Sequence, residues 1–188
     1  MANDDDTDLY PEDRLRRAAL LCRSTLTNIA YFRGRRAMQG RTITDVFQIV
    51  IANNFLDMAV LEWCKLFGDA EDTRRQNMQK HSWRLIVTDA SAFEVGLLSQ
   101  LSCSSVEFEA LRDYVRTYRD KFIAHLDELR TGRPPMLVNL KASAAYYLDY
   151  LLQHEHNSAA FIPAELSATE FYREREVEGD AYYSRLVR

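Results

Sequence analysis

Apolar residues recur every three or four positions along most of the chain, which is the spacing of an amphipathic helix. The first stripe follows Pro11, and its members are Leu15, Ala19, Cys22, Leu26 and Ile29. Proline suits the first helical position because the N–H it lacks would have no partner there. The pattern predicts a helix from Pro11 to about Met38, closed by Gly40.

A second stretch runs from the capping residues Thr44 and Asp45 to Phe67 and stops at Gly68. It is apolar around most of its circumference, and only a narrow strip of polar positions interrupts it. A helix of this kind is buried on several sides, by its neighbours or by a second subunit.

The rest of the chain contains further helical patterns, some weak and some strong. After a charged connector over residues 69–80, the pattern predicts short helices over Trp83–Thr88 and Ser91–Leu101. A long helix follows the Ser104/Glu107 capping box towards Leu129 and ends before the break at 132–135. The last two helices are expected over Leu140–His154 and from the Ser167/Glu170 capping box towards Tyr183.

These elements predict an all-α, single-domain helical bundle of five long helices joined by short ones. The chain has only six Gly and four Pro in 188 residues, which is little punctuation for a fold of strands and turns. We expect residues 11–188 to form the domain. Residues 1–10 are acidic and polar, so we expect them to be disordered.

The cysteines and the N-terminus favour a cytoplasmic location. Cys22, Cys64 and Cys103 are an odd, widely spaced set in apolar surroundings, which indicates buried thiols in a reducing compartment. The acidic start of the chain resembles neither a signal nor a transit peptide. No run of about 18 uncharged apolar residues occurs, so no membrane span is predicted.

The formal charge is −4, but basic residues gather near the N-terminus. Between Glu12 and Arg41 there are eight arginines against two acidic residues, a local charge near +6. Within this segment Arg35 and Arg36 are candidates for contact with phosphate. The alternative interpretation is a solvated helix end, where cations are favoured.

The chemistry is concentrated in residues 117–127, TYRDKFIAHLD. His125 occupies a step of the apolar stripe, and Lys121 lies four positions earlier on the same face. A neighbouring cation lowers the pKa of a histidine, so a neutral imidazole could act as a general base. Arg112, Arg116 and Arg119 form an adjacent ridge that could hold a phosphate. The alternative is a core or interface histidine bonded to a backbone carbonyl.

The sequence from Arg119 to His125, RDKFIAH, resembles the motif of the HEPN superfamily, an arginine, often a polar residue, and a histidine after four to six further positions. Together with Lys121 and the AHLD at 124–127, it is most similar to abortive-infection-type HEPN proteins. The stretch LEWCKLFG at 61–68, followed by His81 and Trp83, is similar to that branch too. The resemblance covers roughly Ile43 to Asp127.

The resemblance implies a helical homodimer in which the motifs of two subunits line one cleft and cut RNA without a metal or cofactor. His125 would be the general base or acid, Arg119 would hold the phosphate, and Asp120 would position them. We expect Arg116 and Lys121, with Arg35 and Arg36, to bind the RNA. The setting would be phage defence or a toxin system, with an antitoxin-like protein as a further partner.

Helical geometry restricts how this motif could work. On one straight α-helix, six residues turn roughly 240° beyond a full turn, so Arg119 and His125 do not share a face. Arginine reach, a local distortion or pairing across a dimer could bring them together. The alternative function is a non-catalytic dimeric interaction module, or a nucleotide-binding module, with the same fold.

The aromatic residues and the histidines near residue 155 are two further candidates for binding sites. Trp63, Trp83 and the tyrosines at 146, 147 and 150 could stack on bases, but aromatic residues at helical spacing are usually core. His154 and His156 lie two apart, so on a helix they point in different directions, and we predict no metal site.

Overall fold

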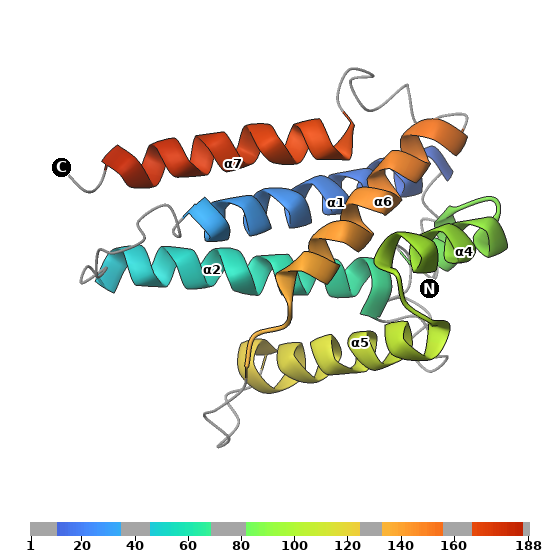
Figure 1. The fold of residues 1–188 in the computed structure, drawn as a ribbon, viewed down its shortest axis with the longest axis horizontal. Helices are drawn as coiled ribbons and strands as arrows, with labels where there is room; N and C mark the ends of the chain where they lie inside the picture. Colours follow the sequence, from blue (N-terminus) through green and yellow to red (C-terminus); the bar gives the residue numbers. More distant parts are fainter. Residues whose placement is uncertain (1–10, 35–45, 69–81, 125–132, 156–166, 186–188) are drawn as a thin grey trace, which may run out of the picture.

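Helices make up nearly all of the chain that the computed structural model describes, residues 11–34, 46–68, 82–124, 133–155 and 167–185 (Figure 1). The five long helices are α1 (Pro11–Gly34), α2 (Val46–Trp63), α5 (Ser105–Tyr118), α6 (Leu137–His154) and α7 (Ala168–Arg185). The shorter α3 (Trp83–Ile86) and α4 (Ala90–Leu101) lie between α2 and α5. No strand occurs in these ranges, and the predicted all-α bundle is confirmed.

The predicted helix limits are met closely where the structure describes them. α1 begins at Pro11, α4 starts one residue earlier than expected, and α6 starts at Leu137 rather than Leu140. The expected disorder of residues 1–10, the caps at Thr44 and Asp45, the connector at 69–80 and the helix ends near Met38 and Leu129 lie outside the described residues.

Helix α1 is the centre of the bundle. It packs against α2, α6 and α7, and Figure 1 shows α7, α1 and α2 running side by side while α6 crosses α1. Small residues allow this close packing, because Ala18, Ala19, Cys22 and Ala30 are almost completely buried. A Cβ on Gly34 would lie 2.8 Å from the backbone of Gly179, so α1 and α7 meet backbone to backbone.

Helix α2 is less enclosed than its composition suggested. Its C-terminal half is core, with Leu56, Val60 and Trp63 buried. Its N-terminal half leaves Val46 70% exposed and Phe47 68% exposed. The apolar circumference predicted burial by neighbours or by a second subunit, and within one chain the neighbours cover only half of the helix.

Two capping boxes predicted from the sequence are present. The Oγ of Ser104 accepts the N–H of Glu107, whose carboxylate accepts the N–H of Ser104 at 2.8 Å. Ser167 and Glu170 repeat the arrangement at the start of α7, with the N–H of Ser167 donating to the Glu170 carboxylate over 3.0 Å. These bonds to the charged form lower the pKa of both glutamates.

The aromatic residues build the core, as the spacing indicated. Phe93 is fully buried, and Trp83 stacks on it with ring centroids 4.9 Å apart. The rings of Tyr146, Tyr147 and Tyr150 also pack against Phe93. The indole N–H of Trp63 donates to the Oγ of Ser143 over 2.7 Å, which satisfies a buried donor.

No disulfide joins the three cysteines. Cys22 and Cys64 are buried as expected, but Cys103 is only half-buried, because it follows the left-handed turn at Ser102 that separates α4 from α5. Burial raises the pKa of the Cys22 thiol well above its ordinary value.

Among the described residues, one helix is long and apolar enough to cross a membrane by length and composition, Val46–Gly68. It was not expected from the sequence, because Asp57, Glu62 and Lys65 interrupt its apolar run. Glu62 is buried and accepts hydrogen bonds from Ser24 and Asn28 of α1. The core helix of a soluble bundle meets the same length and composition, so the absence of a span stays a prediction.

Candidate functional site at the end of helix α5

Helix α5 does not continue regularly into the motif. At Arg119 its α-helical hydrogen bonding changes to the wider π form, which lasts to Ala124. The Nε of Arg119 donates to the Oδ1 of Asp120 over 2.8 Å within this segment. Single π-helical turns are rare and occur often at functional sites. The irregular turn therefore coincides with the motif that the sequence singled out.

A ridge of arginines leads into this segment along α5. Arg112 is 4% exposed, and Arg116 follows one turn later beside Asp113, with 3.8 Å between Nη1 and Oδ1. The Nε atoms of Arg112 and Arg116 are buried without a hydrogen-bond partner in the described part of the chain. Buried donors are normally satisfied, so these two N–H groups are exceptions within the described part of the chain.

The ridge lies against a second π-helical segment, Cys64–Gly68, which follows the last residue of α2. A Cβ on Gly68 would lie 3.3 Å from the Cγ of Arg116, so the absence of a side chain lets the arginine stem pack there. The contacts are reciprocal, because α5 packs on Cys64–Gly68 and α2 packs on Arg119–Ala124. The two stretches that carry the resemblance are therefore neighbours in the fold.

Two residues beside the motif were not singled out by the sequence analysis. Asp57 of α2 is half-buried, and desolvation raises the pKa of its carboxyl. Burial also raises the pKa of Tyr118, and the negative charge of Asp57 raises it further, which places the two groups close together. Only the packing of α2 on α5 brings them together, because 61 positions separate them in the sequence.

The structure brings together four of the predicted site residues. Arg116, Arg119, Asp120 and Lys121 lie in the last turn of α5 and the segment that continues it, all partly accessible. The predicted catalytic residue His125 and the predicted phosphate contacts Arg35 and Arg36 lie outside the described residues.

The local distortion changes the helical register between Arg119 and Ala124. A π turn inserts about one extra residue, so residues six apart across it are separated by about five α-helical steps, roughly 140° beyond a full turn. An α-helix would give roughly 240°. On a regular continuation of either helix, positions six apart do not share a face, and His125 itself lies outside the described residues.

The basic segment after α1 is described only at its beginning. Arg33 lies close to α6 and α7. Burial of Lys141 lowers the pKa of that lysine, and the positive charge of Arg33 lowers it further. The Nζ of Lys141 lies 3.8 Å from the centroid of the Tyr172 ring. Burial raises the pKa of Tyr172 to about 12, so this hydroxyl stays protonated. Arg33 is thus partly buried and close to Lys141 and Tyr172.

The remaining predicted groups are structural. The ring of exposed His154 packs on Tyr150, with centroids 4.5 Å apart, while His156 lies outside the described residues. Among the side chains that the structure describes, no group of three or more His, Cys, Asp and Glu could hold a metal ion.

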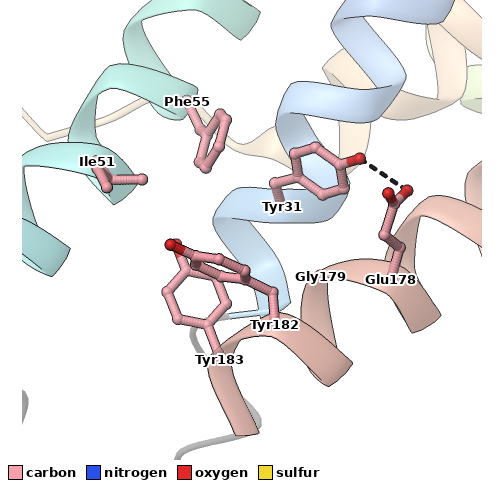
Figure 2. Close-up of a pocket in the computed structure, with 7 residues that line it drawn as sticks. All are labelled: Tyr31, Ile51, Phe55, Glu178, Gly179, Tyr182 and Tyr183. Carbon is pink, nitrogen blue, oxygen red and sulfur yellow. Dashed lines mark hydrogen bonds between the residues drawn. The ribbon is translucent and has the colours of Figure 1, made fainter. Parts of the chain in front are cut away.

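A pocket outside the motif was missed by the sequence analysis. It lies between α1, α2 and α7, has a volume of about 350 Å³ and is lined largely by Tyr31, Phe55, Tyr182 and Tyr183 (Figure 2). These residues come from three separate helices. Spacing within each helix therefore gave no signal that their rings meet.

Comparison of the chain with family models, with curated proteins and with solved structures found no match. The geometry at the end of α5 and the amino-acid sequence of the motif are therefore the basis for a functional assignment.

Proposed function

We propose that this chain is a HEPN-like, RNA-binding protein with metal-independent endoribonuclease activity, acting as a homodimer in the cytoplasm as part of a phage-defence or toxin system. The observation that carries the proposal is the Arg119–Asp120 pair, joined at 2.8 Å inside a π-helical turn. The motif assigns Arg119 to the phosphate and Asp120 to its positioning. A carboxylate bound to the guanidinium is an arrangement that serves both roles.

The surroundings of the pair favour an anionic ligand. The positive charges of Arg112 and Arg116 precede Arg119 on the same ridge, and that of Lys121 follows it. Arginine presents N–H groups in a fork that matches the oxygens of a phosphate. In cleavage, His125 would accept the proton of the ribose 2′-OH, and the arginines would stabilise the charge that develops on the phosphorane.

The dimer is part of this proposal, because one helix does not place positions 119 and 125 on a common face. The exposed apolar half of α2, which we call the α2 apolar face and define by Val46, Phe47 and Val50, is a candidate for its interface. Exposed apolar patches of this kind commonly mark protein contacts. Val50→Glu would place a charge in such an interface, so we expect this variant to be a monomer in sedimentation analysis.

The decisive experiment measures cleavage and binding of a fluorescein-labelled, mixed-sequence single-stranded RNA in EDTA. We expect cleavage by the wild type and none by His125→Ala. Arg119→Ala should weaken binding and lower the salt dependence of log K by about 0.7, the value for one phosphate contact on a single strand. Arg173→Ala, an exposed arginine of α7, is the matched control and should leave both unchanged.

The outcomes separate the parts of the proposal. Unchanged cleavage by His125→Ala removes this histidine from the mechanism. Absence of both cleavage and binding in the wild type refutes the RNA-processing class.

The second candidate is a non-catalytic dimeric interaction or nucleotide-binding module, with an antitoxin-like protein as one type of partner. The α2 apolar face favours the interaction form, since Val50 is 48% exposed beside the two more exposed residues. A dimer that resists dissociation but neither binds nor cuts RNA would support the interaction form. Thermal stabilisation by a nucleotide, without its hydrolysis, would support nucleotide binding.

A further inference from the structure

The pocket between α1, α2 and α7 is walled by aromatic rings on several sides. Tyr31 and Phe55 meet edge to face with centroids 5.3 Å apart, and Tyr182 and Tyr183 do the same at 5.6 Å. Figure 2 shows the first pair on one side of the hollow, the second pair on another, and Ile51 closing the end. A volume of about 350 Å³ is within the range of small-molecule sites.

Two glycines make this arrangement possible. Gly34 and Gly179 let the backbones of α1 and α7 meet, which brings Tyr31 over the C-terminal turns of α7. A Cβ on Gly179 would lie 3.3 Å from Cδ1 of Tyr31, tighter than an ordinary contact. The ring can therefore lie flat against the α7 backbone and line the pocket.

The helix segment beside the rings carries a net negative charge, although its nearest carboxylate is ion-paired. The hydroxyl of Tyr31 donates to the Oε2 of Glu178 over 2.7 Å, and the Nη1 of Arg175 lies 3.0 Å from the same oxygen. Burial, followed by this bond to Glu178, raises the pKa of Tyr31, so its phenol stays a neutral donor and its ring stays a neutral π face. From 174 to 180, α7 carries four carboxylates and one arginine.

We propose that this pocket binds a small organic cation, a quaternary or methylated ammonium group. The faces of aromatic rings carry partial negative charge and attract a cation within about 6 Å of the ring centre. Tyr31, Phe55 and Tyr182 line the hollow with accessible ring surface, with the Glu178 carboxylate, paired with Arg175, beside them. A quaternary ammonium needs no hydrogen-bond acceptors, which suits a largely apolar lining. The site is independent of the proposed RNA chemistry at α5.

The test compares choline with its uncharged isostere 3,3-dimethyl-1-butanol, in which carbon replaces the ammonium nitrogen. Binding of each to the full chain is measured by calorimetry and by NMR titration. We expect saturable binding of choline and at least about tenfold weaker binding of the isostere, the size expected from a desolvated cation–π contact. Equal affinities would show an apolar site with no preference for cations and overturn the proposal.

Matched variants tie the binding to the pocket. Tyr182→Leu removes one ring at a position that is 48% exposed, and Tyr114→Leu does the same on α5, where the tyrosine is 47% exposed and does not line the pocket. We expect about tenfold weaker choline binding for Tyr182→Leu and no change for Tyr114→Leu. Glu178→Gln should weaken choline and leave the isostere unchanged.

Two results contradict the assignment. One is a wild-type dissociation constant for choline above about 10 mM, too weak for a specific site. The other is equal loss of choline binding in the Tyr182 and Tyr114 variants. Circular dichroism of each variant confirms that it is folded, so a loss of binding is not a loss of structure.

Discussion

Arg119 and Asp120 are consecutive in the chain, yet the Nε of the arginine donates to the carboxylate of the aspartate over 2.8 Å. Adjacent side chains on an α-helix do not face each other. The pair lies where α5 passes into its π-helical segment, and the side chain of Arg119 is only 19% exposed. The bond therefore fixes the orientation of a half-buried cation at the proposed phosphate site.

This positioning can be tested with Asp120→Asn. We expect kcat for RNA cleavage to fall by about tenfold or more, because a positioned arginine supplies transition-state charge stabilisation. KM should stay the same or decrease, since the substitution removes a negative charge that repels phosphate. Stability should change by less than about 1 kcal/mol, as for other accessible ion pairs. Steady-state kinetics and urea unfolding measure the two effects.

The control for this variant is Asp113→Asn, which alters the longer 3.8 Å contact to Arg116 at a side chain that is 71% exposed. It should leave kcat unchanged. A higher KM with an unchanged kcat in Asp120→Asn would mean that Asp120 supports binding and does not position the catalytic arginine.

Asp57 gives a prediction about pH. Burial raises the pKa of its carboxyl above the ordinary value of 3.8, so the folded state holds this proton more tightly than the unfolded chain does. Stability conferred by this group is therefore greatest at acid pH and falls as pH rises from 3.8 through the raised pKa. Asp57→Asn removes the ionised form, so the variant should be more stable than wild type at neutral pH.

That advantage should shrink as the pH is lowered towards 3.8, where wild-type Asp57 is protonated as well. Urea unfolding of both proteins across the acid range measures the difference. Asp113→Asn provides the exposed comparison. A difference between Asp57→Asn and wild type that does not vary with pH would contradict the expected titration.

Glu62 joins α1 to α2 through a polar contact inside the bundle. It is 7% exposed and accepts from the Oγ of Ser24 at 2.8 Å and the Nδ2 of Asn28 at 3.0 Å. Glu62→Ala leaves both donors without their acceptor, so we expect a loss of about 2–3 kcal/mol in the free energy of unfolding. Ser24→Ala removes one donor and should cost about 1 kcal/mol.

Chemical denaturation of these two variants and of the double variant gives the coupling between the side chains. Strict additivity would show that the hydroxyl and the carboxylate contribute independently, against the expectation from their contact.

Gly34 tests the close approach of α1 and α7. A Cβ there would lie 2.8 Å from the carbonyl carbon of Gly179, so Gly34→Ala must push the two helices apart. We expect destabilisation of about 1–2 kcal/mol, because overpacking outweighs the gain in helix propensity. Thermal unfolding measures it.

Gly68→Ala is the comparison, because its nearest neighbours are the side chains of Cys64 and Arg116, at 3.2 and 3.3 Å. Side chains move more easily than backbone, so the cost should be smaller. An equal or larger cost at Gly68 would show that the α1–α7 contact is not the tighter one.

The sequence predicted the local features because their causes lie within a few residues. The Ser104/Glu107 and Ser167/Glu170 boxes formed as expected, since each needs only residues three positions apart. It did not predict the π-helical turns, which continue α2 and α5 at their C-terminal ends. For α2 it predicted burial by neighbours or by a second subunit, and within one chain Val46 and Phe47 stay exposed, because an apolar surface indicates that a helix needs cover without indicating what covers it.

The residues of the candidate site were also only partly predictable from the sequence. Arg116, Arg119, Asp120 and Lys121 are close in sequence, and their grouping on one end of α5 could be predicted from helical spacing. Asp57 came to this site, and Tyr31, Phe55 and Tyr182 came together at the pocket, only through contacts between different helices. Such contacts leave no periodic signal in any one segment.

By itself, the sequence determined that the chain is helical, which residues cap and fill its helices, and where basic and acidic groups gather. Hydrophobic period and capping act over one or two turns, so a single segment carries that information. Tertiary structure decided that α1 is central, that Arg119 is paired in a widened turn, and that four aromatic rings enclose a pocket. These depend on helix crossings set by small residues such as Gly34 and Gly179, which act between segments far apart in the chain.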